Sequence, residues 1–278
     1  MKIAWVQDYS RRHGGAELSN KAVVSVGERL GFDVVGVTPK NFPEAVLATC
    51  DLVVVNNFWQ FSDRQTRLVM EVLKQKPFVK YEHDSRELGR PEFAKRLFLN
   101  SALNVFLSPA HLARHKAALE CDGMPLPLAI ETARYTPVPS VKRIPGRALI
   151  VGGWAKGGKT AGSLGRYVQE YSDLEFASVG HQIPGVAVTL PFAEPANMPA
   201  IYSSAEHLVH LPDCFCAGER VIFEAALCGC KVTMNSNVGH ASWGRDLTDP
   251  DGLRAWLDQA PYEFWRMIEG IELRRHAA

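Results

Sequence analysis

The sequence has no long apolar run and no strong charge of either sign. Its longest apolar stretches, such as residues 52–55 and 148–151, have the length of a strand, whereas a membrane-spanning helix needs roughly 20 apolar residues in succession. Residues 1–6 resemble a buried strand and lack the apolar core and small-residue cleavage site of a signal peptide. The sequence therefore predicts a cytoplasmic protein with no transmembrane segment.

The 31 Lys and Arg residues nearly balance the 30 Asp and Glu residues, which gives a net charge of +1. With 46% hydrophobic and 22% charged residues, the composition excludes a collagen-like, disordered or supercharged chain. The six cysteines do not follow the pattern of a small secreted domain. In a reducing compartment we expect them to remain free thiols without disulfides.

Short apolar runs alternate with longer stretches of helical period, a pattern typical of repeated βα units with parallel strands. Strands are predicted at 2–6, 33–37, 52–56, 78–81, 105–107, 148–151, 175–179, 186–190, 207–211 and 231–234. Helices are predicted at 16–30, 63–75, 91–100, 109–120, 161–171, 198–204, 220–228, 252–259 and 262–274. The 278 residues are enough for two such open, doubly wound α/β domains.

A proline-rich segment without a hydrophobic face, residues 132–146, separates the two series of strands and is the best candidate for a linker. We therefore expect an N-terminal domain at 1–135, a linker at 136–146 and a C-terminal domain at 147–260. The remaining residues, 261–278, are expected to form a C-terminal helix that packs back on the N-terminal domain.

Two loops of the first domain carry candidate ligand-binding residues. Gly14 and Gly15 join the first strand to a long helix, and glycines at a helix N-terminus let an anion approach free backbone N–H groups; a tight turn with a purely steric need for glycine is the alternative. His83 and Asp84 follow another strand, where a histidine can donate to a sugar or phosphate oxygen while a carboxylate fixes its tautomer. A structural His-Asp pair is the alternative.

The loop after the strand at 148–151 matches the P-loop pattern from Gly153 to Thr160, in the strand-loop-helix context that such a loop requires. Its glycines, with Lys156 and Lys159, suit a phosphate chain. Against an ATP-binding fold, the nearest candidate for a Walker B strand, residues 207–213, carries two histidines and a proline before its aspartate.

A fourth segment, residues 214–232, leads through Gly218 into a helix that carries Glu219, Arg220 and Glu224 at or near its start. A carboxylate so placed can accept both hydroxyls of a ribose. The two Cys-x-Cys pairs of this segment also suggest zinc, but structural zinc sites usually space their cysteines more widely. Buried free cysteines are the preferred interpretation, and no metal ligand is assigned.

Taken in order, these segments resemble retaining glycosyltransferases of the GT-B fold, family four (glycosyl transferases group 1). The resemblance spans nearly the whole chain and rests on motif order and spacing. It is carried by residues 14–17, 83–84, 108–109, 127–137, 151–153, 156–157, 212 and 224–229.

The resemblance implies two Rossmann-like domains with parallel sheets facing across a cleft, the acceptor bound mainly by the first and the nucleotide sugar mainly by the second. It implies sugar transfer with retention of configuration and without a metal, because cationic side chains and backbone N–H groups neutralise the leaving diphosphate. No tightly bound cofactor is expected, and the donor is expected to be a UDP- or GDP-sugar.

Carried over by position, the predicted catalytic residues are His83, Asp84, Lys156 and Glu219. The predicted donor-binding residues are Gly14, Gly15, Gly152, Gly153, Lys159, Gly218, Arg220 and Glu224.

The chain departs from the family pattern at two positions. Gly153 stands where the family usually has arginine, so Lys156, Lys159 or Arg220 would have to supply that charge. Cys216 stands where the first glutamate of the family's pair is expected, so Glu219 or Asp213 would have to contact the sugar.

Two other functions fit the residues: a P-loop kinase or NTPase, and a catalytically silent protein that binds a nucleotide sugar. For a transferase, the acceptor stays open between a glycan, a lipid-linked sugar, a small molecule and a modified DNA base. The DNA option rests on basic side chains of the first domain that also fit solvated helix faces, namely Arg86, Arg90, Lys95, Arg96, Arg114, His115 and Lys116.

Overall fold

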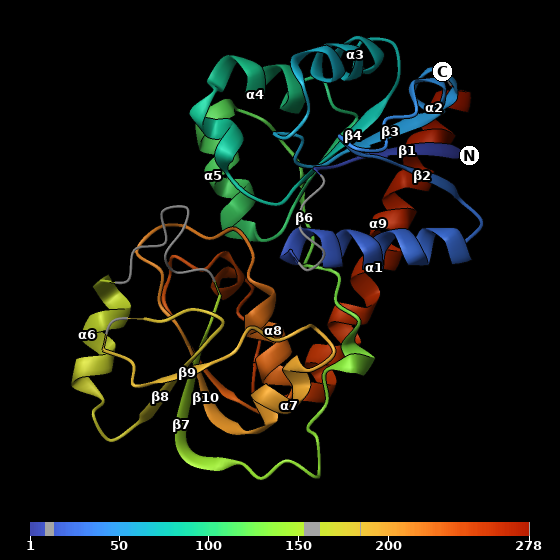
Figure 1. Cartoon of the computed structure of the whole chain (residues 1–278). Helices are drawn as coiled ribbons and strands as arrows, with labels where there is room; N and C mark the ends of the chain where they lie inside the picture. Colours follow the sequence, from blue (N-terminus) through green and yellow to red (C-terminus); the bar gives the residue numbers. More distant parts are fainter. Residues whose placement is uncertain (9–13, 153–161, 184, 278) are drawn as a thin grey trace. The chain divides into compact units, whose positions relative to one another are not determined.

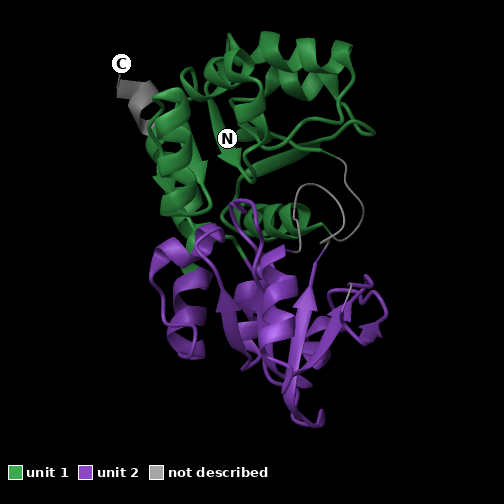
Figure 2. Ribbon diagram, turned by 90° about the vertical axis from the view of Figure 1, so that its left-hand side faces the viewer, with its two compact units in different colours: residues 1–129, 259–278 green, residues 130–258 purple. Residues whose placement is uncertain are grey.

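The computed structural model describes residues 1–8, 14–152, 162–183 and 185–277 (Figure 1). The chain divides into two compact units: unit 1 comprises 1–129 and 259–278, and unit 2 comprises 130–258 (Figure 2). Both are α/β units with parallel sheets, which confirms the predicted fold class. Among the described residues, none of the helices combines the length and the apolar character needed to cross a bilayer.

The sheet of unit 1 has six strands in the order β2-β1-β3-β4-β5-β6. Their bounds are β1 Lys2–Val6, β2 Asp33–Val37, β3 Leu52–Val55, β4 Phe78–Glu82, β5 Leu103–Phe106 and β6 Met124–Pro125. The strand order reverses between β1 and β3. In open parallel sheets, ligands bind beyond the carboxyl ends of the strands at such a reversal, so this point is where a site is expected in unit 1.

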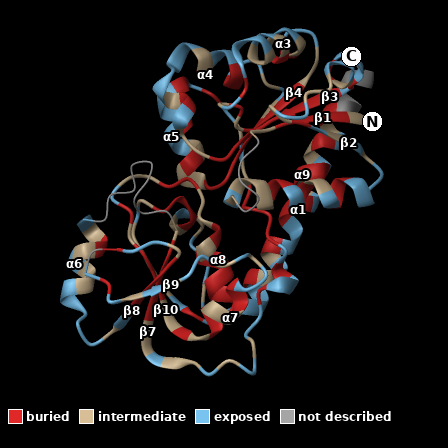
Figure 3. Ribbon diagram, in the orientation of Figure 1, coloured by how far each residue is buried: buried red, intermediate tan, exposed pale blue. Residues whose placement is uncertain are grey.

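Helices cover both faces of this sheet. They are α1 Gly15–Arg29, α2 Glu44–Thr49, α3 Asp63–Leu73, α4 Pro91–Phe98 and α5 Pro109–Leu119, with the 3-10 turn η1 at Arg86–Gly89. Ala4 and Val6 belong to a core cluster with residues of α2, α3 and α4, whereas Trp5, which points to the opposite face, contacts Trp265 at a ring distance of 6.3 Å. The inner strands β1, β3 and β4 are accordingly buried on both sides (Figure 3).

Unit 2 has a five-stranded sheet in the order β11-β10-β7-β8-β9. Its strands are β7 Ile144–Val151, β8 Glu175–Val179, β9 Val188–Leu190, β10 Ala205–His210 and β11 Lys231–Met234, and its helices include α6 Gly162–Glu170, α7 Met198–Ser203 and α8 Arg220–Leu227. With β7 taken as the first strand, this is the order 3-2-1-4-5 of dinucleotide-binding folds. The reversal lies between β7 and β10, so the loops after these two strands mark the expected ligand position of unit 2.

The chain ends in one long helix, α9 Pro250–Ala277, with Pro261 inside it. The prediction of two separate helices, 252–259 and 262–274, is therefore wrong. A proline inside a helix removes one backbone hydrogen bond, and here burial compensates, because Phe264 and Trp265 are 0% exposed. Trp265 Nε1 donates to the backbone oxygen of Val23 at 2.8 Å, which ties α9 to α1 within unit 1.

The segment predicted as a linker, 136–146, falls within unit 2. The Arg143 guanidinium donates to the backbone oxygens of Gly229 at 2.7 Å and Cys228 at 3.0 Å, and the Val138 backbone N–H donates to Ser203 Oγ at 2.9 Å. The short elements α2 and β6, and the extension of β7 back to Ile144, were not predicted from the sequence either. These segments are too short to show a repeating hydrophobic pattern.

Candidate functional site

A polar pocket of about 280 Å³ opens in unit 1 at the reversal of strand order. Gln7 and Asp8 reach it from the end of β1, Asn56 and Asn57 from the end of β3, and His83 from the end of β4. The first turns of α1 also contribute Gly15, Ala16, Glu17 and Asn20. The predicted Gly15, His83 and Asp84 are thus brought together, and Gly14 precedes them as the N-terminal cap of α1.

A chain of hydrogen bonds fixes the proton on the His83 ring. The indole of Trp5 can only donate, so the Gln7 atom that it meets at 3.2 Å is Oε1. That oxygen also accepts a hydrogen bond from Asn20 Nδ2 at 2.8 Å. With its nitrogen held there, the Asn20 amide presents its oxygen, Oδ1, to His83 Nε2 at 3.0 Å. Nε2 must then carry the hydrogen, and in the neutral ring Nδ1 carries none.

The Asp84 carboxylate is held by its neighbours rather than by His83. It accepts from Asn57 Nδ2 at 3.0 Å and from the backbone N–H of Arg86 at 2.8 Å. Burial raises the pKa of Asp84 above its usual value. The hydrogen bond from the Arg86 backbone and the charge of Arg86 act in the opposite direction. Asn20 thus orients the His83 ring, a role that the sequence predicted for a neighbouring carboxylate.

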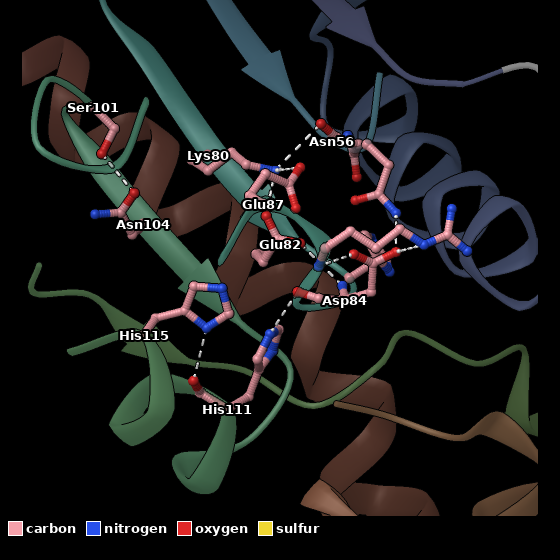
Figure 4. Close-up of polar contacts among 12 residues, drawn as sticks. Asn56, Lys80, Glu82, Asp84, Glu87, Ser101, Asn104, His111 and His115 are labelled. Atoms are coloured by element: carbon pink, nitrogen blue, oxygen red, sulfur yellow. Dashed lines mark hydrogen bonds and ion pairs between the residues drawn. The ribbon is translucent and has the colours of Figure 1, made fainter. Parts of the chain in front are cut away.

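A buried charged cluster lies directly behind this pocket (Figure 4). Lys80 Nζ lies 2.5 Å from Glu82 Oε2 and 3.5 Å from Glu87 Oε1, and all three side chains are at most 1% exposed. Burial raises the pKa of Glu82 well above its usual range, and the negative charge of Glu87 is the second cause. The charge of Lys80 opposes this shift. Glu82 Oε1 accepts the backbone N–H of Asp84 at 3.0 Å, so the cluster supports the turn that carries His83.

Two histidines of α5 complete this support. His111 Nδ1 accepts the backbone N–H of Leu107 at 3.3 Å, and its Nε2 lies 2.9 Å from the Asp84 backbone oxygen, to which it donates (Figure 4). His115, one turn later, is 0% exposed. The basic character assigned to it from the sequence is therefore wrong, because burial lowers its pKa to about 4.

In unit 2, the predicted donor-binding residues of α8 form a buried ion pair. Arg220 Nε lies 2.9 Å from Glu224 Oε1, one helical turn away, and both side chains are less than 10% exposed. Tyr202 donates its hydroxyl to Glu224 Oε2 at 3.1 Å. The buried pair also affects Tyr135: burial raises the pKa of Tyr135 to about 12, and the negative charge of Glu224 is the second cause. The Glu224 carboxylate is thus already engaged by Arg220, Tyr202 and Tyr135.

The remaining predicted residues of unit 2 lie near its strand reversal. Gly152 follows β7 with a φ of +115°, which favours glycine, and Gly218 precedes Glu219, the N-terminal cap of α8. The predicted Gly153, Lys156 and Lys159 lie outside the described residues, as does the rest of the P-loop pattern up to Thr160.

The helix after that loop is already capped by a carboxylate. Asp213 accepts the backbone N–H groups of Gly162 at 2.8 Å and Ser163 at 2.9 Å. These are the first N–H groups of α6, and a phosphate bound as in a P-loop would need N–H groups of this kind. The observation disfavours the kinase or NTPase interpretation.

Among the described residues, two groups of side chains bring possible metal-ligand atoms within 4.8 Å of one another: His210, Cys216 and Glu219 in unit 2, and Glu82, Asp84 and Glu87 in unit 1. In the second group, Glu82 and Glu87 already pair with Lys80.

The six cysteines are free thiols, and Cys228 and Cys230 are buried as expected of core cysteines.

Sequence reasoning missed most of the residues that shape the pocket of unit 1. Asn56 is 1% exposed, and neither its Nδ2 nor its Oδ1 has a hydrogen-bond partner among the described residues. Gln7 and Asn20 orient His83. Their positions, directly after strands and in the first turns of α1, were the available signal, since ligands of open parallel sheets bind beyond the carboxyl ends of the strands.

Comparison with known proteins identifies the fold. No protein-family model and no curated protein sequence matches the chain. Among solved structures, a sucrose-phosphate synthase from Thermosynechococcus elongatus matches with a TM-score of 0.66 and 14% identity, over 99% of this chain and 97% of the other. An alpha-glucosyltransferase in complex with UDP and DNA containing an HMU base matches with a TM-score of 0.63 and 11% identity, over 94% and 93%. Anabaena HepE in complex with UDP and glucose matches with a TM-score of 0.59 and 14% identity, over 100% and 98%. These neighbours are GT-B proteins, and the chain has the GT-B fold.

Proposed function

We propose that this GT-B chain is a glycosyltransferase that moves a sugar from a nucleoside diphosphate sugar to an acceptor hydroxyl, with retention of configuration and without a metal ion. The observation that carries the proposal is the pocket of unit 1, where His83 presents a ring with a fixed proton at the reversal of strand order. The three structural neighbours described above are compatible with it, because two of them hold UDP.

The pocket of unit 1 offers the hydrogen-bonding groups that a sugar needs. In the neutral His83 ring, Nδ1 can accept a sugar hydroxyl, while Asn20 keeps the ring in place. The Asn56 amide can both donate and accept, and its buried atoms have no partner among the described residues. Leaving such an amide unpaired costs free energy that a bound sugar would recover.

In unit 2 we assign the nucleotide to the loops after β7 and β10. Gly152 lets the backbone approach the diphosphate, and Arg220 with Lys156 and Lys159 supplies positive charge. Glu224 binds the ribose in this proposal: a carboxylate has about four acceptor sites, so the bonds from Arg220, Tyr202 and Tyr135 leave capacity for a hydroxyl.

Retention would follow from attack on the same face as the departing diphosphate, through an oxocarbenium-like state. The site must then mainly stabilise the charges of the oxocarbenium-like sugar and the departing diphosphate. His83 and Asp84 from unit 1 and Glu219 from unit 2 are the residues that we assign to the sugar and the acceptor hydroxyl.

A thermal-shift screen tests donor binding. UDP, GDP, ADP and TDP and their common sugar conjugates are compared with Mg-ATP. A ligand at 100 times its Kd stabilises by about 2.7 kcal/mol, or roughly 5 °C at this size. We expect a uridine or guanosine diphosphate to raise Tm in the presence of a chelator. A shift with Mg-ATP alone would contradict the proposal.

A second candidate, a nucleotide-sugar binder without transferase activity, is favoured by two observations. Cys216 stands where the family pattern expects a glutamate, and Glu224 is already paired with Arg220. This candidate predicts the same thermal shift but no release of free nucleoside diphosphate from the sugar conjugate.

A further inference from the structure

A second pocket of unit 1 is lined by other residues of the loop that follows β3. It has a volume of about 240 Å³ and is walled by Phe58, Trp59, Phe61 and Phe93. The pocket beside His83 is lined by Asn57 and Gln60 of the same loop, so one short segment separates the two. At ~30 Å³ per water, the volume equals that of about eight waters, which suits one six-membered ring.

The aromatic walls are held by contacts with one another. Phe58 lies 5.6 Å from Phe93 and 6.1 Å from Phe61 between ring centroids, and Trp59 lies 6.5 Å from Phe93. Contacts in this range are favourable, so the walls are preorganised for an apolar ring face.

Two buried polar atoms at this pocket point to a ligand with hydrogen-bonding groups. Glu87 is 1% exposed and binds Lys80 through Oε1, and its Oε2 has no partner among the described residues. The indole Nε1 of Trp59 likewise has none there. A hydroxyl can donate to Glu87 Oε2 and accept from Trp59 Nε1, and hydrogen bonds to a carboxylate are stronger than neutral ones.

The lining disfavours two other classes of ligand. The Arg90 guanidinium, its one described cation, lies 4.6 Å from the centroid of the Trp59 ring. Asp63 and Glu87 outnumber Arg90 among the described charged residues of the lining, which opposes a phosphate polymer. A plain hydrocarbon would leave Glu87 Oε2 buried and unpaired, at a cost in free energy.

We infer that this pocket is a subsite for a neutral sugar ring of the acceptor, with the aromatic walls against the C–H faces of the ring and Glu87 and Trp59 on its hydroxyls. The inference rests on the proposed function and specifies its acceptor as a glycan rather than DNA. The loop after β3 would place the next part of the same acceptor beside His83.

Isothermal titration with neutral methyl hexopyranosides and maltose, with and without UDP, tests the inference. We expect at least one glycoside to bind. Trp59→Ala should weaken that binding tenfold or more, and Trp59→Phe, which keeps a ring but loses the N–H, should weaken it less. Phe192→Ala removes an exposed aromatic side chain of unit 2 and should change nothing. Each variant is first checked for an unchanged circular dichroism spectrum.

The outcomes separate this inference from the proposed function. If UDP binds and no glycoside does up to its solubility limit, the subsite inference is overturned. It is also overturned if a duplex with a hydroxymethylated pyrimidine binds with an affinity that depends on Trp59 while no glycoside binds. If a glycoside binds in a Trp59-dependent way but no nucleotide sugar binds, the subsite is supported and the proposed function fails.

Discussion

His83 owes the position of its ring proton to Trp5, Gln7 and Asn20, none of which needs to touch a substrate. We expect ¹⁵N NMR of the neutral ring to show a protonated Nε2 and an unprotonated Nδ1. Gln7→Leu removes the oxygen that orients Asn20, so the amide can turn over and the tautomer preference should weaken. Gln75→Leu, the same change at an exposed position of unit 1, should leave the spectrum as it is. A wild-type ring protonated at Nδ1 would refute the assignment.

The Arg220–Glu224 pair makes the second residue-scale prediction. Glu224→Ala leaves the guanidinium buried without its carboxylate, which typically costs about 3–5 kcal/mol, or on the order of 10 °C in Tm. The double variant Arg220→Leu/Glu224→Leu removes both charges and should lose less stability. Equal Tm values for wild type and Glu224→Ala would show that the pair does not hold the helix. Because Glu224→Ala lowers the stability of the protein, weaker nucleotide binding by this variant is compared with its lower Tm before a lost ribose contact is inferred.

Among the elements, α1 and α9 pack so closely that one glycine is required between them. A Cβ on Gly27 would lie 2.1 Å from Trp265 Cζ2, so Gly27→Ala should destabilise the protein by roughly 1–3 kcal/mol through overpacking. A Cβ on Gly270, in α9, would meet no atom of the described residues within 4 Å, so Gly270→Ala should stabilise by about 0.5–1 kcal/mol. Urea unfolding of both variants measures the contrast, and effects of the same sign would contradict it.

Helix α5 carries a pH dependence because its buried face includes His115. Burial lowers the pKa of His115 from 6.5 to about 4, so between these pH values the unfolded chain binds a proton that the folded chain does not. The free energy of unfolding therefore falls as pH drops from 6.5 to about 4. The contribution is on the order of 3 kcal/mol, at 1.36 kcal/mol per pKa unit.

Urea unfolding between pH 4 and 6.5 tests this contribution from His115. His115→Gln keeps a donor for the His111 backbone oxygen and should make the slope of stability against pH shallower. His181→Gln, at an exposed position, should leave the slope unchanged. An unaltered slope in His115→Gln would show that this histidine is not responsible.

At the scale of the whole molecule, hydrophobic periodicity was sufficient to predict the parallel sheets and most helices, because buried strands and amphipathic helices leave repeating patterns. It failed at Pro261, where the packing of Phe264 and Trp265 maintains a helix that the local sequence disfavours. Gly14, Gly152 and Gly218, which the glycine pattern singled out, also follow strands that stand at the reversals of strand order. Asn56, Gln7 and Asn20 were missed because single polar residues give no periodic signal, and their role depends on partners distant in the sequence.

The most direct test of the central claim is the release of free nucleoside diphosphate from a nucleotide sugar, with the anomeric configuration of the product read by ¹H NMR. We predict that wild type, in the presence of a chelator, releases the diphosphate and forms a product with the donor's configuration. His83→Ala should slow this by about 10²-fold, the usual cost of one stabilising group, while the diphosphate still raises its Tm. Donor binding without any release or product would contradict the claim.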